Sequence, residues 1–309
     1  MENIKLNVKD MKLLAELEKN GRAPFSRIAK SIGVSKEVAN YRFKRLVENG
    51  LIKGFFPVID YFALGYRCYR LIINLENIKY HIRKNIIEDL RKMKDVDTTV
   101  FLFSEWDVEI LVWVKTPGEF YEFYNKIIDM YSEYMASKDF SLVTRMYFLA
   151  NDYLHKVPYS VMIGDTNKIE KIDGDDEKIL DEIKKDPRQE LSSMAAKLNI
   201  SLNTVQYRLK QLYSKNIIKG IIPILNVSLL GYNRYKIELI LSKQALRSKV
   251  INYLKTRNEV TKISEIIGRN DMSFEANFKT NAELDTFLED LRLNSSNVQN
   301  FEVMNMIVE

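Results

Sequence analysis

The chain has 309 residues, of which 46% are apolar and 29% charged, values ordinary for a soluble globular protein with room for several domains. One cysteine, Cys68, excludes a disulfide framework, and with two histidines it gives too few soft ligands for a structural zinc cluster. No apolar run approaches the ~20 residues that span a bilayer, and the N-terminus lacks a signal-peptide pattern, so we expect a cytoplasmic protein. The net charge of +5 permits nucleic-acid binding without requiring it.

The first segment, 1–63, carries the pattern of a small helical domain. Apolar residues recur at helical spacing in three stretches, at 8–20, 25–32 and 36–49. Ser35 is a natural N-cap for the third helix, and Gly33 marks a tight turn before it. An apolar, extended stretch follows at 51–60, in which Pro57 suits an edge strand better than a central one. Three helices with this turn, followed by a strand, are typical of a winged helix-turn-helix domain.

The next segment, 64–150, alternates strands and helices. Strands are predicted at 69–75, 96–103, 108–114 and 142–149, and helices at 82–93 and 117–131. The order βαββαβ predicts an α+β, ferredoxin-like domain with both helices on one face of an antiparallel sheet. We expect the other face to be apolar and covered by the matching sheet of another copy, either in the same chain or in a second chain.

The second half of the chain repeats the first. The run Asn40-Tyr41-Arg42-Phe43-Lys44-Arg45-Leu46 recurs as Gln206-Tyr207-Arg208-Leu209-Lys210-Gln211-Leu212, at an offset of 166 residues. This offset is too long for a solenoid repeat and indicates a duplicated module. We therefore predict a second winged helix at 172–229 and a second ferredoxin-like domain at 230–309. The turn-forming stretch 151–171 belongs to neither copy and is predicted to be a linker.

The elements of the second copy follow in the same order. Its winged helix is expected from helices at 176–185 and 191–198, a third helix capped by Ser201, and a strand that begins at Ile217. Its ferredoxin-like domain is expected from strands at 235–241, 260–267, 272–278 and 298–306, with helices at 245–255 and 282–291.

The motif around the third helix resembles the Lrp/AsnC family of transcriptional regulators. In the first copy it reads Ser35-x-x-x-Ala39-x-x-Arg42-Phe43-Lys44-Arg45-Leu46-x-x-x-Gly50-Leu51-Ile52-Lys53-Gly54. The second copy has a slightly weaker form, Ser201-x-x-x-Val205-x-x-Arg208-Leu209-Lys210-x-Leu212 through Ile217-Ile218-Lys219-Gly220, with Asn216 in the position of Gly50. The resemblance covers nearly all of the chain apart from 151–171. It implies a winged helix-turn-helix followed by a ligand-responsive (RAM-like) ferredoxin-like domain, which pairs sheet to sheet and often forms larger oligomers. Most members carry one copy, so the tandem arrangement is a departure from the pattern.

We predict that the third helix of each copy reads DNA. Asn and Gln side chains can bond adenine edges, and Arg and Lys side chains can bond guanine or phosphate. The predicted DNA-contact residues of the first copy are Ser26, Arg27, Lys36, Asn40, Tyr41, Arg42, Lys44, Arg45 and Lys53. Those of the second copy are Asn203, Thr204, Gln206, Tyr207, Arg208, Lys210 and Lys219. The second copy is expected to hold DNA more weakly, because its first helix is rich in aspartate.

The resemblance also implies a small-molecule effector such as an amino acid, bound near a Gly-x-x-Asp loop between sheet strands. The second copy has this loop as Gly268-Arg269-Asn270-Asp271, whereas the first has Ser104-Glu105-Trp106-Asp107. The predicted effector residues are Ser104, Asp107, Gly268 and Asp271. Taken alone, either loop is better explained as a plain hairpin turn than as a ligand site. If only one loop binds an effector, the second copy is the expected one.

The sequence thus predicts a non-enzymatic, DNA-binding transcriptional regulator with no cofactor or metal, acting as a homo-oligomer or as a pseudo-dimer within one chain. Siroheme decarboxylases, which resemble this family, are one alternative. Their sites depend on histidine and arginine between the domains, and neither loop contains a histidine. The other alternative is an architectural or adaptor protein that binds without reading sequence.

Overall fold

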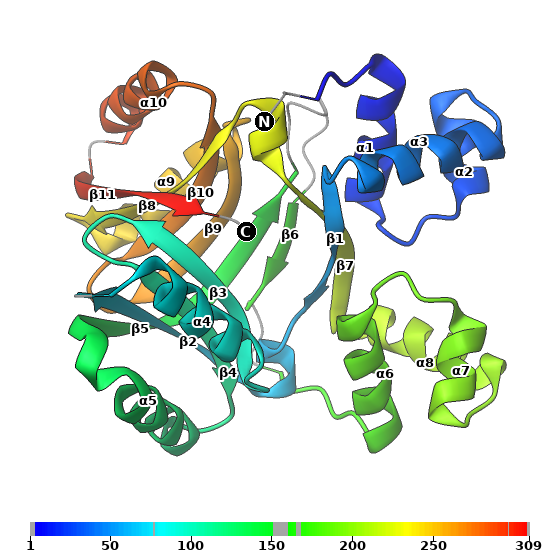
Figure 1. Cartoon of the computed structure of the whole chain (residues 1–309), viewed down its shortest axis with the longest axis horizontal. Helices are drawn as coiled ribbons and strands as arrows, with labels where there is room; N and C mark the ends of the chain where they lie inside the picture. The colour runs from blue at the N-terminus through cyan, green and yellow to red at the C-terminus, as the bar shows by residue number, and fades with distance from the viewer. Residues whose placement is uncertain (1–3, 77, 151–159, 165–167, 296, 308–309) are drawn as a thin grey trace. The chain divides into compact units, whose positions relative to one another are not determined.

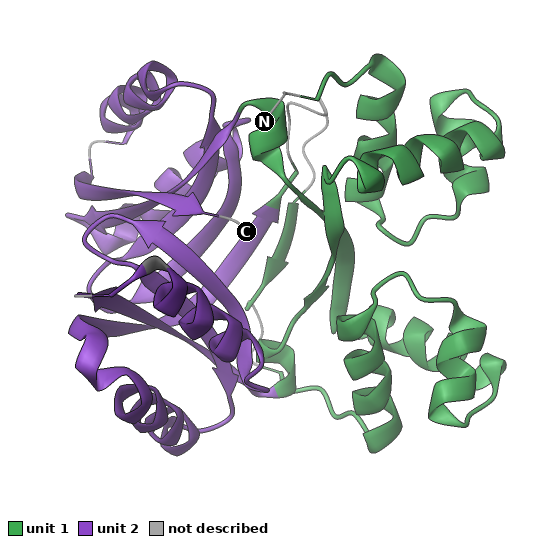
Figure 2. Ribbon diagram, viewed as in Figure 1, with its two compact units in different colours: residues 1–64, 149–231 green, residues 65–148, 232–309 purple. Residues whose placement is uncertain are grey.

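The computed structural model describes residues 4–76, 78–150, 160–164, 168–295 and 297–307. The chain divides into two compact units, which Figure 2 shows in green and purple. Unit 1 comprises residues 1–64 and 149–231, and unit 2 comprises residues 65–148 and 232–309. Each unit therefore contains one part from each half of the chain: unit 1 holds both winged helices and unit 2 holds both ferredoxin-like halves.

Both winged helices of unit 1 have the predicted three helices and strand (Figure 1). The first copy consists of α1 (Val8–Lys19), α2 (Phe25–Ile32), α3 (Lys36–Glu48) and β1 (Ile52–Ile59). The second copy consists of α6 (Gly174–Lys185), α7 (Leu191–Leu198), α8 (Leu202–Ser214) and β7 (Ile218–Leu225). The helical spacing in the sequence identified these elements to within two residues at most ends.

The turns around the third helix have the same geometry in both copies, although their residues differ. Gly33 ends α2 with a φ of 67°, and Asn199 ends α7 with a φ of 55°. Gly50 and Asn216, which follow α3 and α8, also have positive φ values of 73° and 57°. Asparagine tolerates this left-handed conformation better than most residues, so the second copy keeps the backbone path without the glycines.

The strand after each third helix pairs with its counterpart in the other copy. β1 and β7 form a two-stranded antiparallel ribbon, in which Ile52 lies opposite Leu225 and Ile59 opposite Ile218. The expected strands are therefore present, but in the described residues they join the two copies instead of folding into separate wing hairpins. Pro57 lies in this ribbon, whose strands are both edges, as predicted.

Unit 2 contains both predicted βαββαβ modules, which confirms the α+β fold class. The first consists of β2 (Arg67–Leu75), α4 (Tyr80–Arg91), β3 (Val96–Phe103), β4 (Val108–Val114), α5 (Pro117–Tyr131) and β5 (Met135–Leu149). The second consists of β8 (Asn233–Leu241), α9 (Arg247–Lys255), β9 (Val260–Ile267), β10 (Met272–Phe278), α10 (Asn281–Asn294) and β11 (Val298–Ile307). The helices pack on the outer faces of the sheets, for example through Ile127 of α5 and Phe287 of α10.

The two modules of unit 2 join into one closed barrel. The described strands of this unit follow the order β2-β4-β3-β11-β8-β10-β9-β5, and β5 pairs with β2 to close the ring. One seam between the copies pairs β3 with β11, and the other pairs β5 with β9. The sheets therefore cover one another within a single chain, which was one of the two arrangements left open by the sequence.

The expectation that the covered sheet faces are apolar is only partly correct. Ile72, Leu102, Trp106, Met304 and Met306 form a buried apolar cluster, but charged residues are buried beside it. Arg70 and Glu109 of the first copy and Lys236 and Glu238 of the second are buried inside the barrel. Arg70 contacts Glu238, and Lys236 contacts Glu109, so ion pairs cross between the copies. Burial acts to raise the pKa of the Glu109 carboxyl, but attraction by Lys236 and Arg70 holds that pKa below its ordinary value. The sequence predicted that the matching sheet would cover this face, but it did not reveal that charged residues of the two sheets pair across it.

Two other segments differ from the expectation. The strand predicted at 142–149 begins earlier, at Met135, because its polar first half pairs along β2, with Met135 opposite Leu75. Within the predicted linker 151–171, residues 160–163 form a short strand, β6 (Ser160–Ile163). Residues 151–159 and 165–167 of that linker lie outside the described residues. No helix in the described ranges is long and apolar enough to cross a bilayer.

Candidate DNA-binding surface

The third helix of each winged helix has one buried and one exposed face. Ala39 and Leu46 of α3 are buried, as are Val205, Leu209 and Leu212 of α8. Ser35 and Ser201 cap the two helices, and each side chain accepts a hydrogen bond from the backbone N–H three residues on. This cap and buried stripe fix which side chains face outward.

Most of the predicted DNA-contact residues lie on the exposed face. In the first copy Ser26, Arg27, Lys36, Tyr41, Lys44 and Lys53 are exposed, and Asn40 is half-buried. In the second copy Asn203, Gln206, Tyr207 and Lys210 are exposed, whereas Thr204 and Lys219 are half-buried. Tyr41 and Tyr207 occupy equivalent positions and are 66% and 64% exposed. Each predicted DNA-reading helix, α3 or α8 (the two readers), therefore presents an aromatic ring at the same place.

Two predicted contact residues of α3 are already bound inside the domain. Arg42 and Arg45 both pair with the carboxylate of Asp10 on α1, at 2.8 and 2.7 Å. Asp10 is fully buried and also belongs to the capping box of α1 with Asn7. Because a buried carboxylate needs such partners, the two arginines hold α3 against α1. The structure thus gives these two predicted DNA-contact residues a structural partner, and their contact with DNA stays a prediction.

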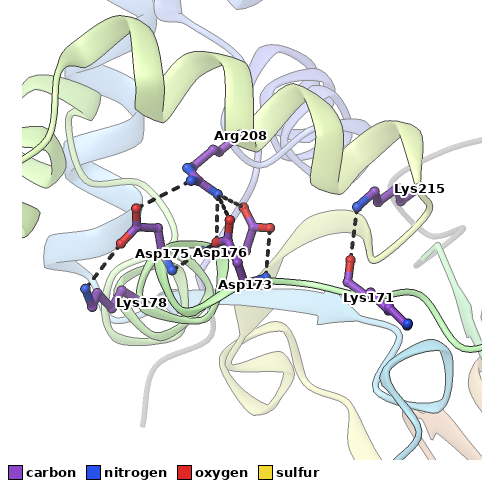
Figure 3. Close-up of polar contacts among 7 residues, drawn as sticks. All are labelled: Lys171, Asp173, Asp175, Asp176, Lys178, Arg208 and Lys215. Atoms are coloured by element: carbon purple, nitrogen blue, oxygen red, sulfur yellow. Dashed lines mark hydrogen bonds and ion pairs between the residues drawn. The ribbon is translucent and has the colours of Figure 1, made fainter.

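The equivalent arginine of the second copy is held more strongly. Arg208 pairs with Asp173 at 2.7 Å, Asp176 at 2.9 Å and Asp175 at 3.4 Å (Figure 3). Hydrogen bonds to Asp173 and Asp176 raise the pKa of the Arg208 guanidinium, and the Asp173 carboxyl has a lowered pKa because Arg208 binds it. In the first copy the residues equivalent to Asp173 and Asp175 are Asn7 and Lys9. Three carboxylates therefore offset the positive charge of Arg208, whereas Arg42 and Arg45 share one, so Arg208 should attract a phosphate less strongly than Arg42.

The overall charge of the two winged helices differs in the same sense. Residues 6–53 contain 11 Lys and Arg against 5 Asp and Glu, a net charge of +6. Residues 173–219 contain 9 Lys and Arg against 8 Asp and Glu, a net charge of +1. Since phosphate neutralisation dominates DNA affinity, the first copy is the better electrostatic match for DNA.

Two arginines that were not predicted from the sequence link the winged helices. Arg22 donates to the carbonyl oxygens of Pro187 and Gln189 at 2.7 and 2.8 Å, and Arg188 donates to that of Gly21. The Arg188 guanidinium also lies within 5.0–5.3 Å of the ring centroids of Phe25, Phe43 and Phe55. Arg22 and Arg188 are separated by the repeat offset of 166 residues, and this equivalence was the available signal.

The predicted effector residues serve the fold of unit 2. Asp107 accepts a hydrogen bond from the Leu75 N–H at 2.7 Å, and Asp271 accepts one from the Leu241 N–H at 2.6 Å. Each carboxylate also pairs with an arginine of the helix that comes after that strand, Arg83 of α4 or Arg247 of α9. The two aspartates thus fasten the end of a strand in the same way in both copies.

The difference between Ser104 and Gly268 has a packing explanation. A Cβ on Gly268 would lie 2.6 Å from the Cβ of Ser141, on strand β5 of the other copy. Ser104 instead uses its side chain, which accepts a hydrogen bond from the Trp106 N–H at 3.0 Å. Glycine at 268 is therefore required by the seam between the copies. Among the described residues there is also no group of three or more His, Cys, Asp or Glu side chains placed to hold a metal ion.

Comparisons with known proteins agree with this geometry. Residues 6–53 and 173–219 each match the family model described as winged helix-turn-helix DNA-binding. An HTH-type transcriptional regulator of Pyrococcus furiosus is 30% identical over 115 residues, which cover 37% of this chain and 76% of the relative. The regulator Ptr1 of Methanocaldococcus jannaschii is 30% identical over 118 residues, covering 36% of this chain and 76% of Ptr1. The regulatory protein AsnC of Haemophilus influenzae is 26% identical over 130 residues, covering 42% of this chain and 85% of AsnC.

The chain belongs to the Lrp/AsnC family of HTH-type transcriptional regulators. It is a tandem, two-copy form, since each relative matches less than half of it and the winged-helix model matches it twice.

A solved structure has the same fold over nearly the whole length of this tandem Lrp/AsnC protein. The siroheme decarboxylase NirDL covers 98% of this chain and 91% of its own, with a TM-score of 0.63 and 15% sequence identity. At this identity the likeness concerns the fold alone.

Proposed function

We propose that this tandem Lrp/AsnC protein is a sequence-specific transcriptional regulator in which one chain presents two linked, unequal reader helices to one DNA duplex. The observation that carries the proposal is the joining of both winged helices in one compact unit by the β1–β7 ribbon and by Arg22 and Arg188. In a dimeric helix-turn-helix protein two chains set the spacing between the recognition helices, and the two half-sites in the DNA are then equal. Here one chain supplies both readers with different residues, which suits an asymmetric site.

Within each winged helix the charged residues divide into two roles. Arg42, Arg45 and Arg208 hold the reader helix against the first helix, which sets the reader's angle. Exposed cations such as Arg27 and Lys44 remain to neutralise phosphates, which gives affinity without sequence preference. Polar residues along the exposed face of α3 and α8 then read base edges in the major groove.

The two copies contribute unequally in this mechanism. The first copy, with a net charge of +6, anchors the protein on DNA, and the second copy adds a weaker contact whose position is fixed by the covalent and packing links. Arg42→Ala is accordingly expected to weaken DNA binding at least a few-fold more than Arg208→Ala. The carboxylates of Asp107 and Asp271 are occupied by backbone and arginine partners, so the proposal assigns no effector to these loops.

The salt dependence of DNA binding tests the proposal. If both winged helices contact one duplex, about 6–10 phosphates are neutralised, and affinity should fall by about 10³–10⁵ between 50 and 200 mM salt. Lys44→Ala should weaken binding to all sequences and lower the salt slope by about 1. Lys126→Ala, which removes an exposed cation on α5 of unit 2, is the matched control and should change neither. Folded protein that binds no DNA at low salt would refute the regulator function.

A second candidate follows from the whole-chain fold likeness to the siroheme decarboxylase NirDL. We favour the regulator because the relatives at 30% identity are transcriptional regulators, and because the loops 104–107 and 268–271 contain no histidine. The absorbance spectrum of the purified protein, before and after titration with siroheme, separates the two. Stoichiometric binding with a shifted tetrapyrrole band would support the enzyme, and an unchanged sum of spectra would support the regulator.

The third alternative, an architectural protein, is tested by competition with unrelated DNA. Such a protein would bind the unrelated DNA equally well, because it has no sequence preference.

A further inference from the structure

The first turns of the two reader helices carry different chemistry, whereas the following turn is nearly the same. After the caps Ser35 and Ser201, α3 begins Lys36-Glu37-Val38 and α8 begins Leu202-Asn203-Thr204. One turn further on, both helices contain the same Tyr-Arg pair, followed two residues later by Lys44 or Lys210. The largest chemical difference therefore lies in the part of a recognition helix that usually contacts base edges, and Asn40/Gln206 and Arg45/Gln211 are smaller differences further along.

The residues of both first turns are available to a ligand. Lys36, Glu37, Leu202 and Asn203 are exposed, and Val38 and Leu202 each keep 40% of their surface open. Leu202 lies at the start of α8 and is not among the buried residues of that helix. The hydroxyl of Thr204 bonds to Ser201 at 2.8 Å, so its methyl group is what it can offer to DNA.

Each first turn matches one kind of base pair. A lysine donates to the O6 and N7 atoms of guanine, and a glutamate accepts from the N4 amino group of cytosine, so Lys36 and Glu37 together fit G·C pairs. An asparagine bonds both N6 and N7 of adenine, and apolar groups contact the thymine methyl, so Asn203 with Leu202 and Thr204 fits A·T pairs.

We propose that the DNA site of this protein is asymmetric in composition, with a G·C-selecting half-site under α3 and an A·T-selecting half-site under α8. This rests on the proposed function as a DNA-binding regulator. Tyr41 and Lys44 of α3 are matched by Tyr207 and Lys210 of α8. Because equivalent side chains contact equivalent parts of each half-site, both helices should lie on the DNA in the same orientation. Base preference then differs chiefly at the positions under the first turns.

The assignment is tested with a graft and its reverse. The variant Lys36→Leu/Glu37→Asn/Val38→Thr gives α3 the first turn of α8, and Leu202→Lys/Asn203→Glu/Thr204→Val does the opposite. Lys36, Glu37, Val38, Leu202 and Asn203 are exposed, so the grafts should leave the fold unchanged, which circular dichroism and thermal unfolding can verify. Binding is measured on DNA selected from a random pool by the wild-type protein, and on two derived probes in which both half-sites are the G·C type or both are the A·T type.

The expected result is a selected site whose two halves differ in composition about one helical turn apart. The first graft should then prefer the probe with two A·T halves, and the reverse graft the probe with two G·C halves, each by roughly tenfold over the wild-type site. Selected halves of equal composition, or grafts that keep the wild-type preference, would overturn the inference while DNA binding itself stands. Loss of all DNA binding by the folded wild-type protein would instead refute the proposed function, and the inference with it.

Discussion

Arg22 and Arg188 occupy equivalent positions in the two copies, and each donates hydrogen bonds to backbone carbonyls of the opposite winged helix. Burial lowers the pKa of both guanidinium groups, which nevertheless remain charged because arginine starts from a very high value. The contacts are not identical, since Arg188 also packs against Phe25, Phe43 and Phe55. These reciprocal contacts of Arg22 and Arg188 (the arginine brace) act together with the β1–β7 ribbon to fix the spacing between α3 and α8.

Removing the brace should loosen the coupling between the readers. We expect Arg188→Ala to destabilise the protein by about 2–3 kcal/mol, because it removes a hydrogen bond to a buried carbonyl and three cation–π contacts. It should also reduce the penalty for inserting about 5 bp between the half-sites, which rotates them by half a turn. Urea unfolding measures the change in stability. Titration of DNA with and without the insertion of about 5 bp measures the spacing penalty. Arg188→Lys, which keeps the charge without the planar fork, should fall between; equal spacing penalties in all three proteins would contradict the idea.

The pairing of Arg42 with Asp10 predicts a separation of stability from binding. Arg42→Ala should cost about 1–3 kcal/mol of folding free energy, because it removes one of two partners of a fully buried carboxylate. Lys44→Ala, on the exposed face of the same helix, should change stability by less than about 0.5 kcal/mol and yet weaken DNA binding. Denaturant unfolding beside DNA titration distinguishes them. If Arg42→Ala left stability unchanged, the structural role assigned to Arg42 would be wrong.

Releasing Arg208 should strengthen the second reader. Asp173→Asn installs the amide that the first copy has as Asn7, and removes a carboxylate that binds Arg208 at 2.7 Å. We expect DNA affinity to rise at least twofold and the salt slope to steepen by about 0.9, as for one more neutralised phosphate. Asp181→Asn changes the charge of the same helix equally, at a side chain that contacts Lys184 and not Arg208. An identical gain from both substitutions would mean that net charge alone, and not Arg208, is responsible.

The ion pairs inside the barrel predict loss of stability in acid. The folded-state pKa of Glu109 is held below its ordinary 4.5, so its contribution is fully present above pH 4.5 and is lost as the pH falls through the lower folded value. Glu109→Gln should cost about 3–5 kcal/mol at pH 7, because Lys236 is left buried without that charge partner. The variant should also lose less stability than wild type between pH 5 and 3. Denaturant unfolding across that range tests both points, and parallel pH curves would exclude Glu109 as the titrating group.

The seam at Gly268 predicts a local steric effect. Gly268→Ala places a Cβ 2.6 Å from the Cβ of Ser141 and should cost about 1–3 kcal/mol as β5 shifts away from β9. Gly174→Ala is the matched control, since a Cβ there meets nothing within 4 Å. Thermal unfolding of the two variants provides the comparison, and equal stability would show that the seam adapts freely.

The sequence by itself determined the local elements and the duplication. The helices around Leu14, Leu46 and Leu212 followed from the spacing of their apolar residues, and the βαββαβ order followed from periods of two and 3.6. These features depend on neighbours a few residues apart, so a single sequence contains the information. The exposed residues of α3 and α8 were available for the same reason, and the duplication was available because the two halves of the chain can be compared directly.

Only the tertiary structure decided which parts of the two copies join. The pairing of β1 with β7, and the barrel seams β3–β11 and β5–β9, link segments far apart in sequence, and hydrophobic pattern alone does not select a partner strand. The charges of Arg70 and Glu238 looked unsuited to a covered face until the opposite sheet supplied the partner. Likewise, the structural partners of Arg42 and Arg208 could not be read from the sequence, because the aspartates that bind them lie more than thirty residues away along the chain. A charged side chain takes its role from the group it meets in space, and in this protein folding brings those groups together.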